Sequence, residues 1–127
     1  ARGHRLAIAT TTSRGNIDAL LGPALGRDWT NRFAAVVAGE DVTNKKPAPD
    51  VYLEVLARLD LSASECLAIE DSGIGLAAAS GAGIPVLISR GAYFMDDDFS
   101  DALYVTDDLT ELNVAGFVEG SALRAGF

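Results

Sequence analysis

Cysteine and histidine are almost missing from this sequence of 127 residues, which has one of each, Cys66 and His4. A single cysteine forms no internal disulfide, so nothing in the sequence points to an oxidising compartment. The same scarcity argues against a Cys/His metal cage, a Cys-His nucleophilic pair and a Ser-His-Asp arrangement. Cys66 heads a short apolar run, which favours an ordinary core position for its side chain.

Long apolar runs and basic residues are also scarce. No run approaches the roughly 20 residues that a membrane-spanning helix needs, so we expect no membrane partner. The 10 Lys and Arg residues against 18 Asp and Glu residues give a formal net charge of −8. A nucleic-acid binder needs a basic face that displaces counterions from phosphates, so this balance argues against nucleic acid. A small phosphorylated ligand stays compatible with the charge, because a bound cation reverses its local sign.

The sequence does contain short apolar runs that alternate with segments of helical period, and 49% of its residues are hydrophobic. Runs that are apolar throughout are typical of strands covered on both faces, and helices between them indicate βαβ units. The pattern therefore predicts an α/β fold: a Rossmann-like parallel sheet in three layers, with helices on both faces. The expected strands are residues 5–10, 33–38, 66–69, 85–89 and 103–106. The expected helices are residues 13–25, a segment that begins at Pro49, and residues 72–81, with one capped turn at 62–65.

Hydroxyl residues follow the first expected strand, at Thr10, Thr11, Thr12 and Ser13. Ligands of parallel sheets gather at the carboxyl ends of strands, and the N–H groups of a helix N-terminus suit an anion such as phosphate. One Ser or Thr would suffice to cap the helix, so a cluster that only caps it is the alternative interpretation.

Two lysines follow the second expected strand, at Lys45 and Lys46, before the segment Pro47-Ala48-Pro49. The two prolines stiffen the approach and would fix the direction in which a lysine points. A solvated surface lysine is the alternative.

Glu70 and Asp71 follow the third expected strand, before Ser72, Gly73 and Gly75. Adjacent carboxylates at a strand end repel each other, and hard oxygen ligands of this kind suit Mg²⁺. Acids at a helix N-terminus are also favoured by the helix dipole, which explains Asp71 more easily than Glu70.

Two further patterns point to chemistry less strongly. The glycines of residues 73–78 match a dinucleotide-binding pattern loosely, but no ribose-binding acid follows about 20 residues on, where Arg90 stands. The acidic run of residues 96–98 suits a solvated turn or the rim of a site.

Taken together, a threonine, a lysine and a Glu-Asp pair stand in order at three strand ends, at Thr10, Lys46, Glu70 and Asp71. This order resembles the haloacid-dehalogenase-like hydrolases. The stretches LAIATTT (6–12), KPAPD (46–50) and AIEDSGIG (68–75) look like the second, third and fourth motifs of that superfamily. The stretches GEDV (39–42) and AYFMDDDF (92–99) are similar to its CbbY-like branch, which includes relatives of β-phosphoglucomutase. A phosphoacceptor receiver domain shares the residue types, but there the acids precede the threonine.

The resemblance implies roles for individual residues. Thr10 would bind the transferring phosphoryl group with the backbone N–H of Thr11, and Lys46 would neutralise charge, so that Thr10 and Lys46 are the implied catalytic residues. The implied phosphate or substrate ligands are Thr10, Thr11, Thr12, Arg14 and Lys46, and the implied Mg²⁺ ligands are Asp71 and Glu70.

The implied activity is a Mg²⁺-dependent phosphatase of a small sugar phosphate, of the pentulose bisphosphate class, that forms an aspartyl-phosphate. A phosphomutase of the β-phosphoglucomutase type is the alternative within the family, and a non-catalytic fragment or binding module is the alternative outside it. The resemblance also implies a cytoplasmic protein, or a protein of the plastid stroma in a plant, that is monomeric at full length and not secreted.

One family feature has no match in the sequence: the Asp-x-Asp first motif, which carries the nucleophile on an N-terminal strand. The helical cap domain has no match either. We therefore expect residues 1–127 to be the C-terminal part of a core domain that is inactive alone. The expected missing strand lies at the centre of the sheet, between the strands that end at Thr10 and Asp71.

Overall fold

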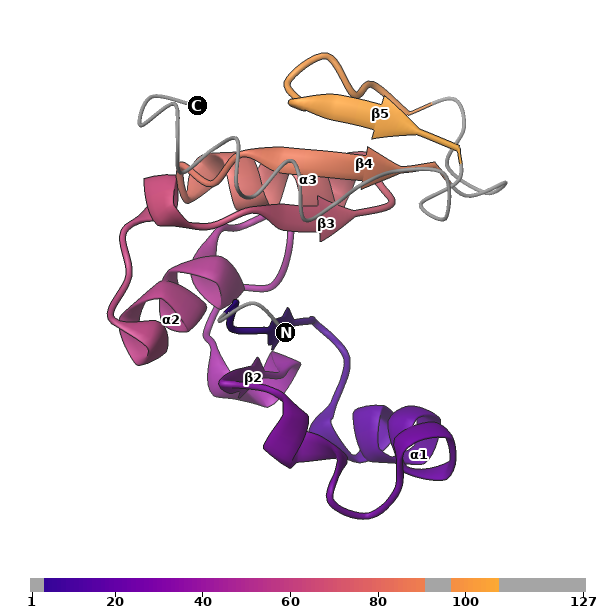
Figure 1. Ribbon diagram of the computed structural model, residues 1–127. Helices are drawn as coiled ribbons and strands as arrows, with labels where there is room; N and C mark the ends of the chain where they lie inside the picture. The colour runs from indigo at the N-terminus through magenta and orange to yellow at the C-terminus, as the bar shows by residue number, and fades with distance from the viewer. Residues whose placement is uncertain (1–3, 91–96, 108–127) are drawn as a thin grey trace.

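The computed structural model describes residues 4–90 and 97–107 and shows an α/β fold with parallel strands (Figure 1). All five expected strands and all three expected helices are present, so the predicted fold class is confirmed. The strands are shorter than the apolar runs that predicted them. The strands are β1 (Ala7–Ala9), β2 (Ala35–Val37), β3 (Ala68–Glu70), β4 (Val86–Ser89) and β5 (Tyr104–Thr106). The α-helices are α1 (Arg14–Leu25), α2 (Asp50–Leu59) and α3 (Gly73–Gly81), and the 3₁₀ turns are η1 (Trp29–Arg32), η2 (Gly39–Asp41) and η3 (Ala63–Glu65).

Polar caps and special backbone residues set where the helices begin and end. The side chains of Ser13 and Ser72 accept hydrogen bonds from backbone N–H groups in the first turns of α1 and α3. Helix α2 begins directly after Pro49 and ends at Asp60, which adopts the left-handed conformation. The expected capped turn at 62–65 is confirmed as η3, where Glu65 accepts from the backbone N–H of Ser62 at 2.9 Å.

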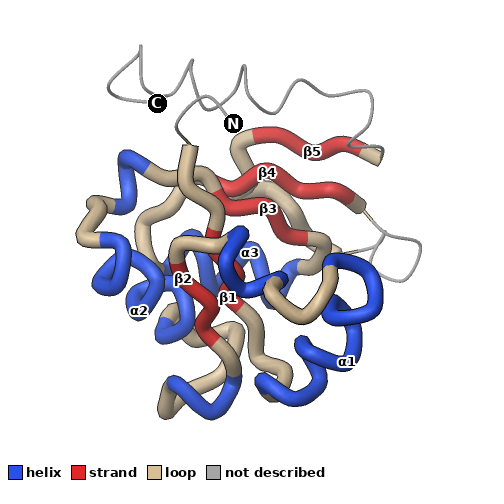
Figure 2. Tube along the Cα trace, turned by 60° about the horizontal axis from the view of Figure 1, so that its bottom comes forward, coloured by secondary structure: helices blue, strands red, loops and turns tan. Residues whose placement is uncertain are grey.

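The strands form two parallel sheets, β1-β2 and β3-β4-β5. Figure 2 shows β1 beside β2, and β3, β4 and β5 side by side. Within residues 4–90 and 97–107, no strand joins β1 to β3, so each of them is the edge of its sheet. Both edges also carry exposed apolar side chains: Leu6, just before β1, is 59% exposed and Ile69 of β3 is 45% exposed.

The two sheets share one core, which α2 and α3 cover. Helix α2 packs on β1 and β2 and contacts α3, which in turn packs on β3 and β4. The residues of this core are Ala35, Val37, Val51, Tyr52, Val55, Leu59, Ala68, Leu76, Ala78, Ala79, Ile84, Val86 and Ile88. Alternate residues of the β2 segment, Val36 and Ala38, instead pack with Ile17 of α1 and Trp29 of η1. Helical layers therefore lie on both faces of β1-β2, as the sequence predicts.

In the part of the chain that the structure describes, no helix has the length and apolar character needed to cross a membrane.

Candidate functional site

The turn after β1 lies directly against Gly39, which follows β2 and Ala38 in the chain. The backbone N–H of Gly39 donates to the carbonyl oxygen of Thr12 at 2.8 Å. A Cβ atom at Gly39 would stand 2.3 Å from the carbonyl oxygen of Thr11, so only glycine permits this approach. The carboxyl ends of β1 and β2 are therefore held together, with the threonine turn between them.

The hydroxyl groups of this turn mostly stabilise the turn and the start of α1. Thr10 Oγ1 accepts from the backbone N–H of Thr12 at 3.2 Å, and Thr12 Oγ1 accepts from Asn16 Nδ2 at 3.1 Å. Ser13 is the N-cap of α1. The backbone N–H of Thr11 has no hydrogen-bond partner among the described residues, and such a group is free to bind an anion. Helix capping thus explains Ser13, whereas the free N–H group of Thr11 is still available to bind an anion.

Lys46 is not a solvated surface lysine. Its Nζ atom lies 2.6 Å from Oε2 of Glu70, and the two side chains are only 13% and 10% exposed. The hydroxyl of Tyr52 donates to the same carboxylate oxygen, and Lys46 Nζ lies 5.3 Å from the centre of the Tyr52 ring. The stiff Pro47-Ala48-Pro49 segment thus directly follows a lysine whose side chain reaches the end of β3.

The surroundings of the Glu70 carboxylate restrict it on both sides. A Cβ atom at Gly75 would stand 1.9 Å from Glu70 Oε1, so the absence of a side chain at Gly75 makes room for this oxygen. Burial, together with the Glu70 charge and the hydrogen bond to it, raises the pKa of Tyr52 far above its usual value. The phenol therefore stays protonated and remains a donor to Glu70.

Asp71 has the opposite environment, although it is the next residue. Its side chain is exposed and has no partner in the described part of the chain. Nearby, Asp97 Oδ2 accepts from the backbone N–H of Gly73 at 2.8 Å, so one residue of the acidic run caps the start of α3. The residues 91–96, which include Asp96, lie outside the described residues.

The two acids expected to bind Mg²⁺ differ in their availability. Asp71 offers a free carboxylate, whereas Glu70 already receives two donors on one oxygen. Within residues 4–90 and 97–107, no group of three His, Cys, Asp or Glu side chains is arranged to hold a metal ion. The donor set fits Mg²⁺ in part: Asp71 supplies one hard oxygen ligand, and a bound ion would take its remaining ligands from water, phosphate or other protein groups.

Arg14 lies at the outer edge of β2. Its Nη2 atom donates to the carbonyl oxygen of Val36 at 3.2 Å and pairs with Asp41, while Arg58 donates to the same carbonyl oxygen at 3.1 Å. The backbone N–H of Ala38, followed by the charges of the two arginines, holds the pKa of Asp41 below its usual value. The structure thus shows a structural partner for Arg14, and its contact with substrate stays a prediction.

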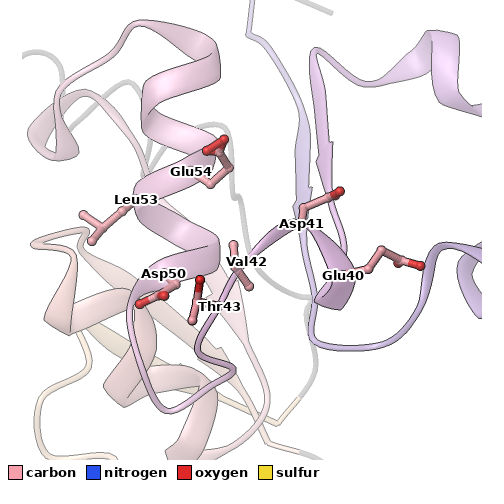
Figure 3. A pocket seen from close by; sticks show the side chains of 7 residues that line it. All are labelled: Glu40, Asp41, Val42, Thr43, Asp50, Leu53 and Glu54. Carbon is pink, nitrogen blue, oxygen red and sulfur yellow. The ribbon is translucent and has the colours of Figure 1, made fainter.

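A separate acidic pocket of about 580 Å³ lies between the segment after β2 and α2 (Figure 3). Its carboxylates are Glu40, Asp41, Asp50 and Glu54, and none of the expected site residues lines it. These carboxylates accept hydrogen bonds from, or form ion pairs with, groups of the chain itself. The pocket is therefore separate from the site at the strand ends.

Sequence reasoning did not identify Tyr52 or Gly75 as members of the site. The Tyr52 ring lies among the buried residues of α2. The available signal was its hydroxyl, since a buried phenol needs a hydrogen-bond partner. Gly75 was part of the stretch AIEDSGIG (68–75) and of the loose dinucleotide-binding pattern, but neither gave it a role beside Glu70.

The chain is an α/β protein with an open backbone N–H in the turn after β1, a lysine paired with Glu70 at the end of β3, and a free carboxylate at the next residue, Asp71. A family model described as "Haloacid dehalogenase-like hydrolase" matches residues 1–89, and the chain belongs to this family.

Curated relatives support the CbbY-like branch. The chain is 54% identical over 107 residues to "Protein CbbY, plasmid" of Cupriavidus necator, which covers 84% of this chain and 42% of that protein. It is 47% identical over 110 residues to "Protein CbbY" of Rhodobacter capsulatus, which covers 87% of this chain and 48% of that protein. The chain thus spans about half the length of the curated relatives it matches.

Solved structures show the same similarity. The crystal structure of CbbY from Rhodobacter sphaeroides in complex with phosphate has a TM-score of 0.86 at 40% identity, over 91% of this chain and 52% of that one. A mutant of the same protein in complex with xylulose-(1,5)bisphosphate has a TM-score of 0.82 at 39% identity, over the same shares of the two chains. A β-phosphoglucomutase from Clostridium difficile has a TM-score of 0.79 at 17% identity, which shows a shared fold.

Proposed function

We propose that this chain is part of a Mg²⁺-dependent phosphatase that acts on a small sugar phosphate of the pentulose bisphosphate class. The observation that carries the proposal is the nearly buried Lys46–Glu70 pair, which lies beside the free carboxylate of Asp71. A fixed cation next to a free acid suits phosphoryl transfer, which depends on positioning and charge compensation more than on covalent chemistry. The phosphate and xylulose-(1,5)bisphosphate complexes of CbbY from Rhodobacter sphaeroides support the substrate class.

The proposed mechanism assigns one task to each group of the chain. The backbone N–H of Thr11 and the hydroxyl of Thr10 bind oxygens of the phosphoryl group. Lys46 neutralises charge on that group as it transfers. Asp71 would hold Mg²⁺, with Glu70 as a second candidate ligand, and the ion supplies further charge compensation when bound. Thr12 and Arg14 are retained as candidates for substrate contact.

We also propose that the nucleophile, an aspartate, comes from a segment outside residues 1–127, which form the C-terminal part of the core domain. Support comes from the sheet itself, since β1 and β3 are both edge strands with exposed apolar residues at Leu6 and Ile69. Such edges are an aggregation hazard unless another strand covers them. A parallel strand between β1 and β3 would pair both edges and bring its carboxyl end beside Thr10 and Asp71.

The test compares the 127-residue chain with a chain extended by the residues that precede Ala1 in its natural gene product. Phosphate release from p-nitrophenyl phosphate and from xylulose 1,5-bisphosphate is measured with and without Mg²⁺. We expect no turnover by the 127-residue chain and Mg²⁺-dependent turnover by the extended chain. Asp71→Asn should abolish this turnover, whereas Asp28→Asn, a matched change at an exposed acid beside η1, should leave it unchanged.

Two results would contradict the proposal. Hydrolysis by the 127-residue chain that Asp71→Asn removes would show that the nucleophile is not outside it. Isomerisation of a sugar phosphate by the extended chain, without net phosphate release, would favour the mutase alternative.

A further inference from the structure

Tyr52 contacts both members of the Lys46–Glu70 pair, one through its hydroxyl and the other through its ring. Its hydroxyl donates to Glu70 Oε2, the oxygen that Lys46 Nζ also contacts at 2.6 Å. Its ring lies under the lysine, with Nζ 5.3 Å from the ring centre, which is within the range of a cation–π interaction. The ammonium therefore has an anion on one side and an aromatic face on another.

The backbone of α2 holds this tyrosine rigidly. Tyr52 is 7% exposed and lies in the main core, in a helix that packs on β1, β2 and α3. A tyrosine side chain has two rotatable angles, so little freedom remains once its ring is buried. Lysine and glutamate are longer and more flexible, and on their own they lose more rotamer freedom when they are ordered. The stiffest of the three side chains thus orders the two flexible ones.

Gly75 completes the enclosure from the opposite side. Its missing side chain leaves room for Glu70 Oε1, which would stand 1.9 Å from a Cβ atom there. The Glu70 carboxylate is thus enclosed between two donors and the backbone of α3. Asp71, by contrast, is exposed and unpartnered among the described residues.

We propose that Tyr52 is a positioning residue, which fixes the Glu70 carboxylate on Lys46 and so holds the lysine ammonium where the phosphoryl group binds. Glu70 then serves mainly to orient the lysine, and Asp71 is the acid left free for the metal ion. A tyrosine that served only to fill the core would need no more than its ring, so phenylalanine would replace it without effect on Lys46. The inference rests on the proposed function, but the placement of Lys46 can be measured without activity.

The first experiment measures the exchange of the Lys46 ammonium protons with water by ¹H–¹⁵N NMR of the extended chain, with the signal assigned through Lys46→Met. In Tyr52→Phe we expect the exchange rate to rise about tenfold, the equivalent of one lost hydrogen bond to a charged group. Tyr104→Phe, which removes the same hydroxyl from β5, should leave the Lys46 rate unchanged. An unchanged rate in Tyr52→Phe would overturn the proposal.

The unmodified chain offers an independent check should Tyr52→Phe fold poorly. A phenol bonded to a carboxylate shows a slowly exchanging O–H proton far downfield, and Glu70→Gln should shift this signal strongly upfield. The absence of such a proton in the folded chain would also overturn the proposal.

The second experiment uses the extended, active chain. Tyr52→Phe should lower kcat about tenfold and change KM less than twofold, with kcat expressed per folded molecule, because Lys46 acts on charge that develops in the transition state. A changed Lys46 exchange rate with unchanged kcat would refute the positioning role in catalysis. An extended chain without activity would refute the proposed function, while the NMR result would still decide the role of Tyr52.

Discussion

Replacement of Gly75 by alanine tests whether the space beside Glu70 is required. Alanine normally stabilises a helix by about 1 kcal/mol relative to glycine. In α3 the new Cβ would stand 1.9 Å from Glu70 Oε1 and 2.4 Å from Cδ, whereas ordinary contact begins at 3.4 Å. The carboxylate therefore has to move, and its bonds to Lys46 and Tyr52 have to rearrange.

The magnitude follows from those bonds. A hydrogen bond to a charged group contributes about 1.5–3 kcal/mol, so the loss of one such bond outweighs the helical gain. We expect Gly75→Ala to lower the free energy of unfolding by about 0.5–2 kcal/mol. Gly22→Ala is the matched control, because a Cβ there meets nothing within 4 Å and the helical gain of about 0.5–1 kcal/mol remains.

Urea unfolding followed by Trp29 fluorescence measures both variants, because Trp29 is the single tryptophan and is 2% exposed. The midpoints should shift in opposite directions with similar slopes. A Gly75→Ala variant as stabilised as Gly22→Ala would show that Glu70 relaxes freely, and the argument that Glu70 is held between Tyr52 and Gly75 would be refuted.

Two further predictions concern the turn after β1 and the edge of β2. Gly39→Ala places a Cβ 2.3 Å from the Thr11 carbonyl oxygen, which belongs to the backbone and cannot move aside. The same urea titration should therefore show that the free energy of unfolding falls by about 3 kcal/mol. A smaller fall than in Gly75→Ala would contradict a rigid contact at Gly39. The backbone N–H of Ala38 and two arginines hold the pKa of Asp41 below 3.8, so the stability it contributes is complete above that pH and is lost as the pH falls through its folded-state pKa. Asp41→Asn should therefore flatten the fall of unfolding free energy below pH 3.8, and an equally steep fall in the variant would contradict the assignment.

The expected elements were recovered because their signals are local. Apolar runs of four to six residues predicted every strand, and Ser13, Pro49 and Ser72 marked where the helices begin. The boundaries were less accurate: the run at residues 5–10 became a strand of three residues, Ala7–Ala9. The length of an apolar run depends only on its side chains, whereas the length of a strand depends on hydrogen bonds to a neighbouring strand. Among the described residues, β1 has such a neighbour on one side only.

The candidate site was predictable only as far as the order of its residues. Thr10, Lys46, Glu70 and Asp71 could be assigned to the ends of parallel strands, and this assignment follows from topology alone. Nothing local distinguishes the two adjacent acids from each other. The structure separates them, because Glu70 turns toward Lys46 while Asp71 faces solvent.

The sequence by itself therefore determined the fold class and the family to which the chain belongs, because periodicity and motif order are properties of neighbouring residues. Only the tertiary structure decided that Lys46 is paired with Glu70, that Tyr52 donates to the same oxygen, and that Gly75 must lack a side chain. These contacts join α2, α3, the end of β3 and the segment between η2 and α2. Their geometry depends on how the helices pack against the sheets, which no stretch of sequence specifies on its own.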